Sequence, residues 1–266
     1  MEKTTALSPF KTTQISTKTS LKSESERGRR QKKHASNSSS NSSYLKTNNN
    51  RSSPLENAKD ELEVLCVQMN KGIDISEKEK EEVDERVKNV EKYYQSSLMS
   101  NTMENVANGY WRVIYSTAPP PSNGRLGPLV GESFQVIESE GARYRNVLSV
   151  PPNSWLAVTL RARYEVLDAE DASEDEVGRT WKVFFEDVGV RVFDRFEPVR
   201  KTFESEKTTR IWRTTYVDED VRVVRAARTM EALDSERARG RNAKAGDEDD
   251  CLFVMTREVP WWELPA

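Results

Sequence analysis

Hydrophobic positions recur every three or four residues before Gly109 and every second residue after it. The first pattern gives segments 56–69 and 76–94 one apolar stripe each, which predicts two amphipathic helices. Gly72 ends the first helix, and Ser76 with Glu79 forms a capping box at the start of the second. We expect this helical pair to pack on the domain that follows it.

Alternation of apolar and polar residues from Gly109 onward predicts a series of short β-strands. The segments are 110–117, 132–138, 143–150, 155–167, 180–186, 190–193, 210–216, 221–226 and 252–256. Eight or nine short strands separated by turns indicate an antiparallel sandwich or barrel. The charged segments 168–176 and 231–250 between them are expected to be surface loops without chemistry of their own.

Charge divides the chain into a basic arm and an acidic body. Residues 1–52 contain eleven Lys or Arg and three acids, a net charge of +8, whereas the whole chain has a net charge of −3. The Ser-rich, Asn-rich composition of this arm cannot bury enough apolar surface to fold, so we expect it to be disordered. A hydroxyl-rich, acid-poor N-terminus is also typical of an organelle transit peptide. The domain prediction is therefore an arm at 1–52, a helical cap at 54–105 and a β domain at 106–266.

Few residues in the body could support catalysis or bind a metal. The single histidine, His34, lies in the basic arm, which removes Ser-His and Cys-His arrangements from the predicted folded part. Cys66 and Cys251 have no metal-ligand spacing and are expected to be buried free thiols, so we predict neither a metal nor a cofactor. No apolar run approaches the roughly 18 residues that span a bilayer, and no signal-peptide core follows Met1. We expect a soluble or peripheral protein.

Three segments resemble the plastid-lipid-associated proteins, or fibrillins, of plants and algae. GYWRVIYST at 109–117 resembles the opening W-x-L-x-Y-T/S strand of this family, and GESFQVI at 131–137 resembles its G-x-x-Y/F-Q-x-I strand. TYVDEDVRVVR at 215–225, followed by LFVMTRE at 252–258, resembles the closing Y-L-D-E-D-L-R-I-x-R … L-F-V-L motif. The resemblance covers residues 55–258, and the lengthened segments 168–176 and 230–250 leave the subgroup open.

This resemblance implies a lipocalin-like antiparallel β-barrel preceded by a helical cap, in a mainly β chain. It also implies a plastid location, at plastoglobules or thylakoids, and association with apolar molecules such as prenylquinones, carotenoids or lipids. The family consists of proteins not established as catalysts. The resemblance strengthens the interpretation of residues 1–52 as a transit peptide.

An eight-stranded barrel has an interior just wide enough for side chains or one small ligand. We predict that one set of side chains faces this interior. These residues are Trp111, Val113, Tyr115, Phe134, Val136, Trp155, Ala157, Phe184, Ile211, Tyr216, Val221, Val223, Phe253 and Met255. They either fill the core completely or enclose a slot for an isoprenoid tail, and the sequence leaves both interpretations open.

Two further groups of residues are candidates for a binding role. Asp218, Asp220, Arg222 and Arg225 form a polar cluster in which Arg225 lies on the strand face opposite to Arg222. The cluster either pins a turn through an Asp–Arg pair or closes one mouth of the barrel, with Arg222 holding a polar headgroup. The adjacent residues 261 and 262 are both tryptophan, and this pair either anchors at a lipid interface or folds back and plugs the open end of the barrel.

The sequence therefore predicts a non-catalytic protein that binds a hydrophobic small molecule or lipid, or lies on a peripheral membrane or lipid-droplet surface. One alternative is an isomerase or cyclase that acts on an apolar substrate and uses Asp218 and Asp220 as acid and base. A second is an assembly module that binds a protein partner through helices 56–69 and 76–94. Nucleic-acid binding is not expected, because the predicted body carries a net charge of −11.

Overall fold

A computed structural model of the chain describes residues 53–94, 106–167, 178–193, 196–204, 207–230, 232–233 and 250–263. The predicted disordered arm at 1–52 and the predicted loop at 168–176 lie outside these residues, as does most of the predicted loop at 231–250. Among the described helices, none is long and apolar enough to cross a membrane.

Two α-helices precede the sheet: α1 (Pro54–Gln68) and α2 (Glu77–Glu91). The Ser53 side chain caps α1 by accepting a hydrogen bond from the Glu56 amide. The predicted capping box of α2 is present, with Ser76 and Glu79 satisfying each other's backbone amides. Each helix begins and ends within three residues of its prediction.

The turn between the helices requires a glycine at position 72. Gly72 has a φ of +82°, and a Cβ built there would lie 2.2 Å from the carbonyl oxygen of Ser116 in the sheet. The neighbouring Lys71 carbonyl accepts a hydrogen bond of 3.1 Å from the Ser116 amide. The end of the first helix is therefore fixed against the first strand by close backbone contact.

Most of the remaining described residues form strands. They are β1 (Gly109–Ser116), β2 (Arg125–Leu126), β3 (Leu129–Val130), β4 (Glu132–Glu138), β5 (Arg143–Val150), β6 (Leu156–Val166), β7 (Thr180–Val192), β8 (Phe196–Thr202), β9 (Thr209–Val217), β10 (Val221–Ala227) and β11 (Asp250–Arg257). A short 3-10 helix, η3 (Trp261–Glu263), follows. The predictions for β4 and β5 match the observed bounds.

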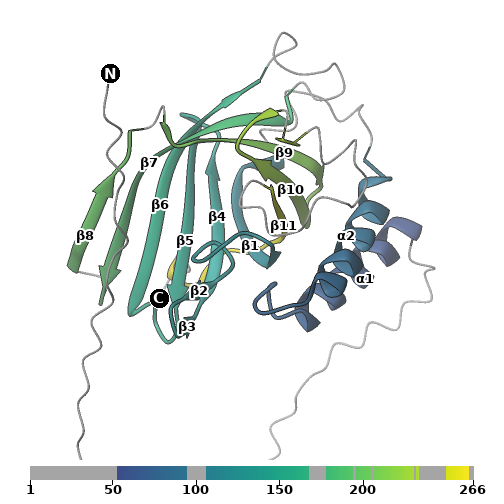
Figure 1. Ribbon diagram of the computed structural model, residues 1–266, viewed down its shortest axis with the longest axis horizontal. Helices are drawn as coiled ribbons and strands as arrows, with labels where there is room; N and C mark the ends of the chain where they lie inside the picture. Colours follow the sequence, from purple (N-terminus) through teal and green to yellow (C-terminus); the bar gives the residue numbers. More distant parts are fainter. Residues whose placement is uncertain are drawn as a thin grey trace, which may run out of the picture. The chain divides into compact units, whose positions relative to one another are not determined.

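The large sheet returns on itself as an antiparallel ring. Its order is β6-β5-β4-β1-β11-β10-β9-β7-β8, and β6 also pairs with β7 (Figure 1). Strand β7 makes this closure possible because it is long: residues 180–184 pair with β9, and residues 187–192 pair with β8. The prediction of a mainly β chain with two leading helices and an antiparallel sheet of about eight ring strands is confirmed. The ring is closed along one half of β7 and continues as an open sheet edge along the other half.

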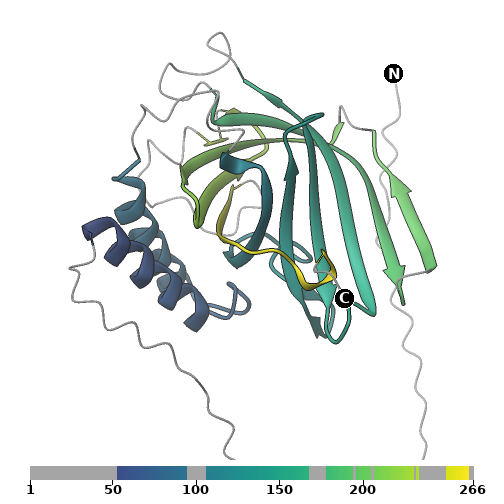
Figure 2. The same ribbon diagram turned by 180° about the vertical axis from the view of Figure 1, so that it is seen from behind.

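The two faces of the sheet bury different partners. One buried cluster draws side chains from all eight strands of the ring and therefore occupies its interior. A second cluster joins the outer faces of β1, β9, β10 and β11 to the apolar stripes of α1 and α2. Figures 1 and 2 show the helices beside these strands and β8 at the far edge of the sheet. Cys66 is buried in this outer cluster as a free thiol, and Cys251 is a half-buried free thiol.

Two strand predictions are corrected by the structure. The predicted strands at 180–186 and 190–193 are one strand, β7, because the intervening residues continue the pairing with β6 past a bulge. Strand β8 was not predicted, since Pro198 and the charged residues around it break the apolar alternation. Every residue of β8 is exposed, as expected for an edge strand. Besides its backbone pairing with β7, the strand is held by an ion pair of 2.9 Å between Arg200 and Asp187.

Candidate functional site

Aromatic side chains pack the half of the ring interior where β7 pairs with β9. The ring of Tyr164 stacks on Trp181 with centroids 4.3 Å apart, and Trp212 stacks on Phe253 at 5.4 Å. Tyr144 meets Trp212 edge-on at 4.9 Å. This half of the interior is a filled core, in agreement with the first of the two interpretations.

A cavity of about 210 Å³ occupies the other half of the interior, where β8 replaces β9 as the partner of β7. Its apolar wall comes from inward-facing residues of β5, β6 and β7, namely Leu148, Val158, Leu160 and Val188, together with Phe203 after β8. Its polar lining residues are Ser122, Ser133 and Asn146, and Pro121, Phe134 and Val147 also line it. Asn146 pairs with Gln135 on the side of the packed core. This half of the ring therefore contains an apolar cavity, but of the predicted interior residues only Phe134 is among those that line it. A slot for an isoprenoid tail stays a prediction.

Valines of β7 and β8 extend the cavity toward the sheet edge, on a face that also carries Lys201, the partner of Val188. Val188 and Val190 are half-buried on the inner face of β7. On β8, Val199 pairs with Val190 and is 53% exposed, and Phe196 pairs with Val192 and is 65% exposed. Because no further strand pairs with β8 within the described residues, this apolar surface is open.

Four of the predicted interior residues lie in the interior cluster: Trp111, Val113, Phe253 and Met255. Their role as ligand contacts stays a prediction. Trp111 is anchored there by a hydrogen bond of 2.7 Å from its Nε1 to the Ala107 carbonyl.

The inward prediction is wrong for Tyr115 because β1 contains a bulge. The register of β1 against β11 shifts between Val113 and Tyr115, so Tyr115 changes face and packs against the helices with Ile114. A second register shift, between Val223 and Val224, occurs where β10 pairs with β9. Tyr216, Val221 and Val223 lie on the helix side as well, and their inward prediction is also wrong.

Further inward predictions fail because both faces of the strands carry apolar residues. Phe134 and Val136 lie on the outer face of β4, whereas Gln135 pairs with the inward residue Trp111. Phe134 is nevertheless among the residues that line the cavity, so its contact with a ligand stays a prediction. Phe184 pairs with Arg163, and the Arg163 guanidinium lies 3.9 Å from the centroid of the Phe184 side chain. Both side chains lie on the outer face of the sheet.

Three more predicted interior residues also lie elsewhere. Ile211 packs with Ala227 and Leu233 in a small separate cluster. Ala157 lies on the outer face of β6, because it alternates with the inward residue Val158. Trp155 precedes β6 and contacts Phe193, with ring centroids 6.2 Å apart.

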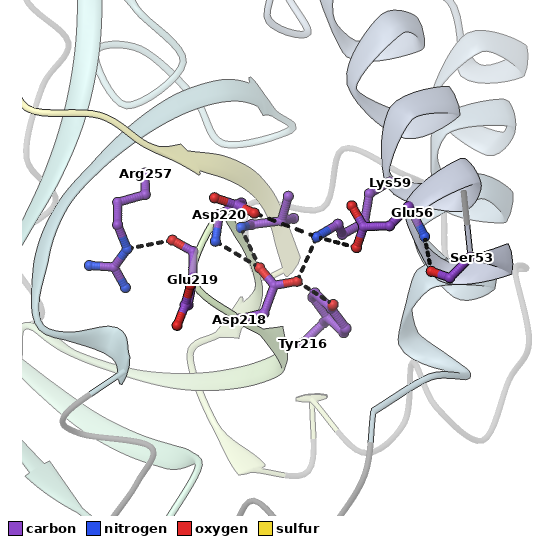
Figure 3. A network of polar contacts seen from close by, with 9 residues as sticks. Ser53, Glu56, Lys59, Tyr216, Asp218, Glu219, Asp220 and Arg257 are labelled. Atoms are coloured by element: carbon purple, nitrogen blue, oxygen red, sulfur yellow. Dashed lines mark hydrogen bonds and ion pairs between the residues drawn. The ribbon is translucent and has the colours of Figure 1, made fainter. Parts of the chain in front are cut away.

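The four residues of the predicted polar cluster do not lie together, because the turn between β9 and β10 directs their side chains apart. The Asp218 carboxylate accepts hydrogen bonds from Lys59 at 2.9 Å, from the Tyr216 hydroxyl at 2.6 Å and from the amides of Asp220 and Val221 (Figure 3). Burial raises the pKa of Asp218, but these four donors outweigh burial and hold it below its usual range. Asp218 therefore pins the turn to α1 through Lys59 rather than through an arginine.

The other members of that cluster have three different environments. Asp220 is exposed and reaches Lys59 only at 3.8 Å. Arg225 lies on the outer face and pairs with Asp84 and Glu91 of α2. Arg222 lies on the inner face and is fully buried, so the prediction that it lies on the face opposite to Arg225 agrees with the structure. These residues do not form a mouth of the ring.

The C-terminal tryptophans fold back onto the sheet. The rings of Trp261 and Trp262 meet the outward side chain of Phe134, with centroids 6.2 Å and 5.0 Å away. Trp261 remains 37% exposed. The pair therefore covers the outer face of β4 rather than plugging an open end of the ring. Its contact with a lipid interface stays a prediction.

Sequence reasoning missed the polar residues of the inner face: Ser133, Gln135 and Asn146. The signal was present, because Ser133 and Gln135 alternate with apolar residues in β4, as does Arg222 in β10. Among the residues that the structure describes, no group of His, Cys, Asp or Glu is placed to hold a metal ion.

Comparison with known proteins places this architecture in a family. A search of curated proteins found no match. The model of the PAP_fibrillin family matches residues 56–230, which spans both helices and the sheet as far as the end of β10. Because this match covers well over half of the chain, the protein belongs to the PAP_fibrillin family.

Proposed function

We propose that the protein binds an apolar molecule in the cavity of the ring interior. The family is plastid-associated and generally lipid-associated rather than catalytic, which sets the class of ligand. The observation that carries the proposal is the cavity of about 210 Å³ whose wall is formed by Leu148, Val158, Leu160, Val188 and Phe203. Burial of apolar ligand surface there supplies the binding free energy.

The size of the cavity limits how much of the ligand it holds. Because a cavity of about 150 Å³ accommodates benzene, a volume of about 210 Å³ holds one ring or a short stretch of chain. The remainder of a prenylquinone, carotenoid or acyl chain lies along the open inner faces of β7 and β8, over Val190 and Val199.

Filling the cavity tests this proposal. Val158→Phe adds volume inside the cavity, whereas Thr159→Phe places the same side chain on the outer face of the same strand. Binding is measured with decyl-plastoquinone by equilibrium dialysis, with circular dichroism as the check of folding. We expect Val158→Phe to weaken binding about tenfold or more and Thr159→Phe to leave it unchanged. Equal affinities in folded wild-type protein and Val158→Phe would contradict the proposal.

The exposed side of β8 favours contact with a lipid surface as a second function. Phe193 and Phe196 are 71% and 65% exposed at the β7–β8 connection, and the basic residues Arg200 and Lys201 lie on the same strand. Exposed aromatic and basic residues together favour the interface of an anionic membrane. We propose that this edge contacts the plastoglobule or thylakoid surface, with Trp261 as a further candidate contact.

Vesicle sedimentation tests the surface contact separately from ligand binding. The double variant Phe193→Ser/Phe196→Ser is compared with Val64→Ser/Val67→Ser, which removes two exposed valines from α1 on the opposite side of the described structure. On vesicles containing sulfolipid and phosphatidylglycerol, we expect only the first variant to lose binding. The reverse result would place the lipid contact on α1 and would contradict this proposal.

The isomerase alternative gains no support from its two predicted acids, since Asp220 is exposed and Asp218 is held as a carboxylate. A general acid needs a raised pKa, whereas the pKa of Asp218 is lowered and its carboxylate is held by Lys59 and Tyr216. Asp218 also lies on the helix side of the sheet, away from the cavity.

A further inference from the structure

Arg222 is a buried charge in the interior of the ring. Its relative exposure is 0%, and its strand neighbour Val224 belongs to the interior cluster. Arg225, three residues further along β10, faces the helices and pairs with two carboxylates. One strand thus carries a paired arginine on its outer face and another arginine on its inner face.

Within the described residues, no carboxylate lies within ion-pair distance of Arg222. Its Nη1 donates to Gln135 Oε1 at 3.3 Å and its Nη2 to Thr214 Oγ1 at 3.2 Å, both long for such bonds. Its Nε has no hydrogen-bond partner. The guanidinium carbon lies 5.1 Å from the Trp181 ring centroid. Burial lowers the pKa of Arg222 to about 10, so the group stays positively charged at neutral pH.

Polar groups between Arg222 and the cavity can donate further hydrogen bonds. Gln135 Nε2 and the hydroxyl oxygens of Tyr144 and Ser133 are buried without hydrogen-bond partners. Gln135 lies between Arg222 and the cavity: it pairs with Asn146 and is two residues from Ser133, and both of those residues line the cavity. A chain of polar side chains therefore connects the charge to the polar side of the apolar cavity.

A buried charge is costly unless an opposite charge pairs with it. The unsatisfied atoms here include guanidinium and amide N–H groups, and the complementary ligand group is therefore an acceptor with a negative charge. A carboxylate has only acceptor oxygens and pairs with guanidinium in a bidentate manner. A ligand carboxylate would replace the long contact between Arg222 and Gln135 Oε1. The Gln135 amide could then turn and donate to the carboxylate through Nε2.

We propose that the interior site takes a lipophilic monocarboxylic acid, whose carboxylate binds Arg222 and Gln135 and whose chain lies in the cavity. This inference rests on the proposed function, because it assigns the head group of the molecule that the cavity binds. The short apolar cavity beside the polar side chains requires a single chain attached directly to the acid group, as in a long-chain fatty acid.

Matched ligands test the head group. Oleate, methyl oleate and oleyl alcohol share one chain and differ only at the head, and their affinities for the full chain are measured by equilibrium dialysis at pH 8. We expect oleate to bind about tenfold or more tightly than the ester and the alcohol. In Arg222→Met this preference disappears, because the affinity for oleate falls to about that for methyl oleate in the same variant. Arg213→Met, which removes a buried arginine from the outer face of β9, keeps the preference.

Stability measurements keep the test decisive if a variant folds poorly. Because Arg222 has no carboxylate partner within the described residues, Arg222→Met without ligand is expected to unfold at the same or a higher temperature. Arg222→Lys keeps the charge and should retain part of the preference for oleate. A preference for oleate that persists in Arg222→Met, or its absence in the wild type, would overturn the inference. If decyl-plastoquinone binds and oleate is not preferred, only this inference fails; if no apolar probe binds, the proposed function fails with it.

Discussion

Nη2 of Arg225 in β10 lies 2.8 Å from Oδ1 of Asp84 in α2. The same guanidinium donates from Nε to Glu91 at 3.0 Å, and all three side chains are less than 20% exposed. Burial raises the pKa of Asp84, but Arg225 and Lys88 outweigh burial and hold it below its usual value. This arginine ties the second helix to the outer face of the ring.

Arg225→Met should lower the free energy of unfolding by about 3 kcal/mol, because it leaves two carboxylates partly buried without their cation. Urea unfolding followed by circular dichroism measures the change. The control is Arg86→Met, which breaks an exposed pair with Glu61 and should cost less than about 1 kcal/mol. Equal losses in the two variants would show that the buried pairs do not hold the helix.

The turn pinned by Asp218 should make stability depend on pH. The pKa of Asp218 is lowered in the folded protein, so its contribution is complete above the unfolded value of about 3.9 and is lost as pH falls through the folded pKa. The pKa values of Asp84 and Glu132 are lowered too and act in the same direction. We expect the urea midpoint of the wild type to fall as the pH drops below about 4.

Asp218→Asn isolates one part of that dependence. It leaves Lys59 buried with only Glu56 and the distant Asp220 nearby, so the variant should be less stable than the wild type at pH 7. Its further loss between pH 5 and pH 3 should be smaller, because one titrating carboxylate is gone. Parallel curves for wild type and variant over this range would contradict the assignment.

The strands were predictable because each contributes a short period-two segment bounded by turn residues. β4 and β5 match their predicted bounds, and the capping box at Ser76 and Glu79 fixed the start of α2. These features depend on local chemistry, which a single sequence carries in full.

The faces of the strands were less predictable, for two physical reasons. The helices cover the outer faces of β1, β9, β10 and β11, so apolar residues lie on both sides and alternation no longer marks the interior. The bulge after Val113 also reverses the alternation of the residues beyond it. Tyr115 was misplaced by the second effect, and Val223 by the first.

The interior site was only partly predictable. Arg222 was named as a candidate for holding a polar headgroup, but the polar residues beside it lie where apolar ones were expected. Phe134 was predicted to face inward, yet Ser133 and Gln135 do. Arg222 belongs to the motif that suggested the family, but only the ring geometry shows that it is enclosed and lacks a carboxylate partner within the described residues. Its partners come from distant strands, and no sequence period encodes that contact.

Gly72→Ala should destabilise the junction between the helices and β1. The new Cβ would lie 2.2 Å from the Ser116 carbonyl oxygen, and the φ of +82° is itself strained for alanine. We expect a loss of at least about 2 kcal/mol in the free energy of unfolding. Gly127→Ala is the control, since its φ is also positive but its Cβ would meet no atom within 4 Å. A loss in Gly72→Ala no larger than in the control would show that the close backbone approach is unimportant.

Cys66 reports whether the helices stay docked on the sheet. Its side chain is fully buried between the helices and the outer sheet face, and burial raises the pKa of the thiol to about 12. Because the thiolate is the reactive form, Cys66 should be unreactive toward a thiol reagent at pH 8 unless the helices separate. In the Cys251→Ser variant, we expect Cys66 to be labelled at the rate of global unfolding. Adding Arg225→Met should make the labelling of Cys66 faster. Rapid labelling of Cys66 without the Arg225→Met change would mean that the helices separate readily from the sheet. The outer cluster would then be a mobile surface rather than a fixed support for the ring.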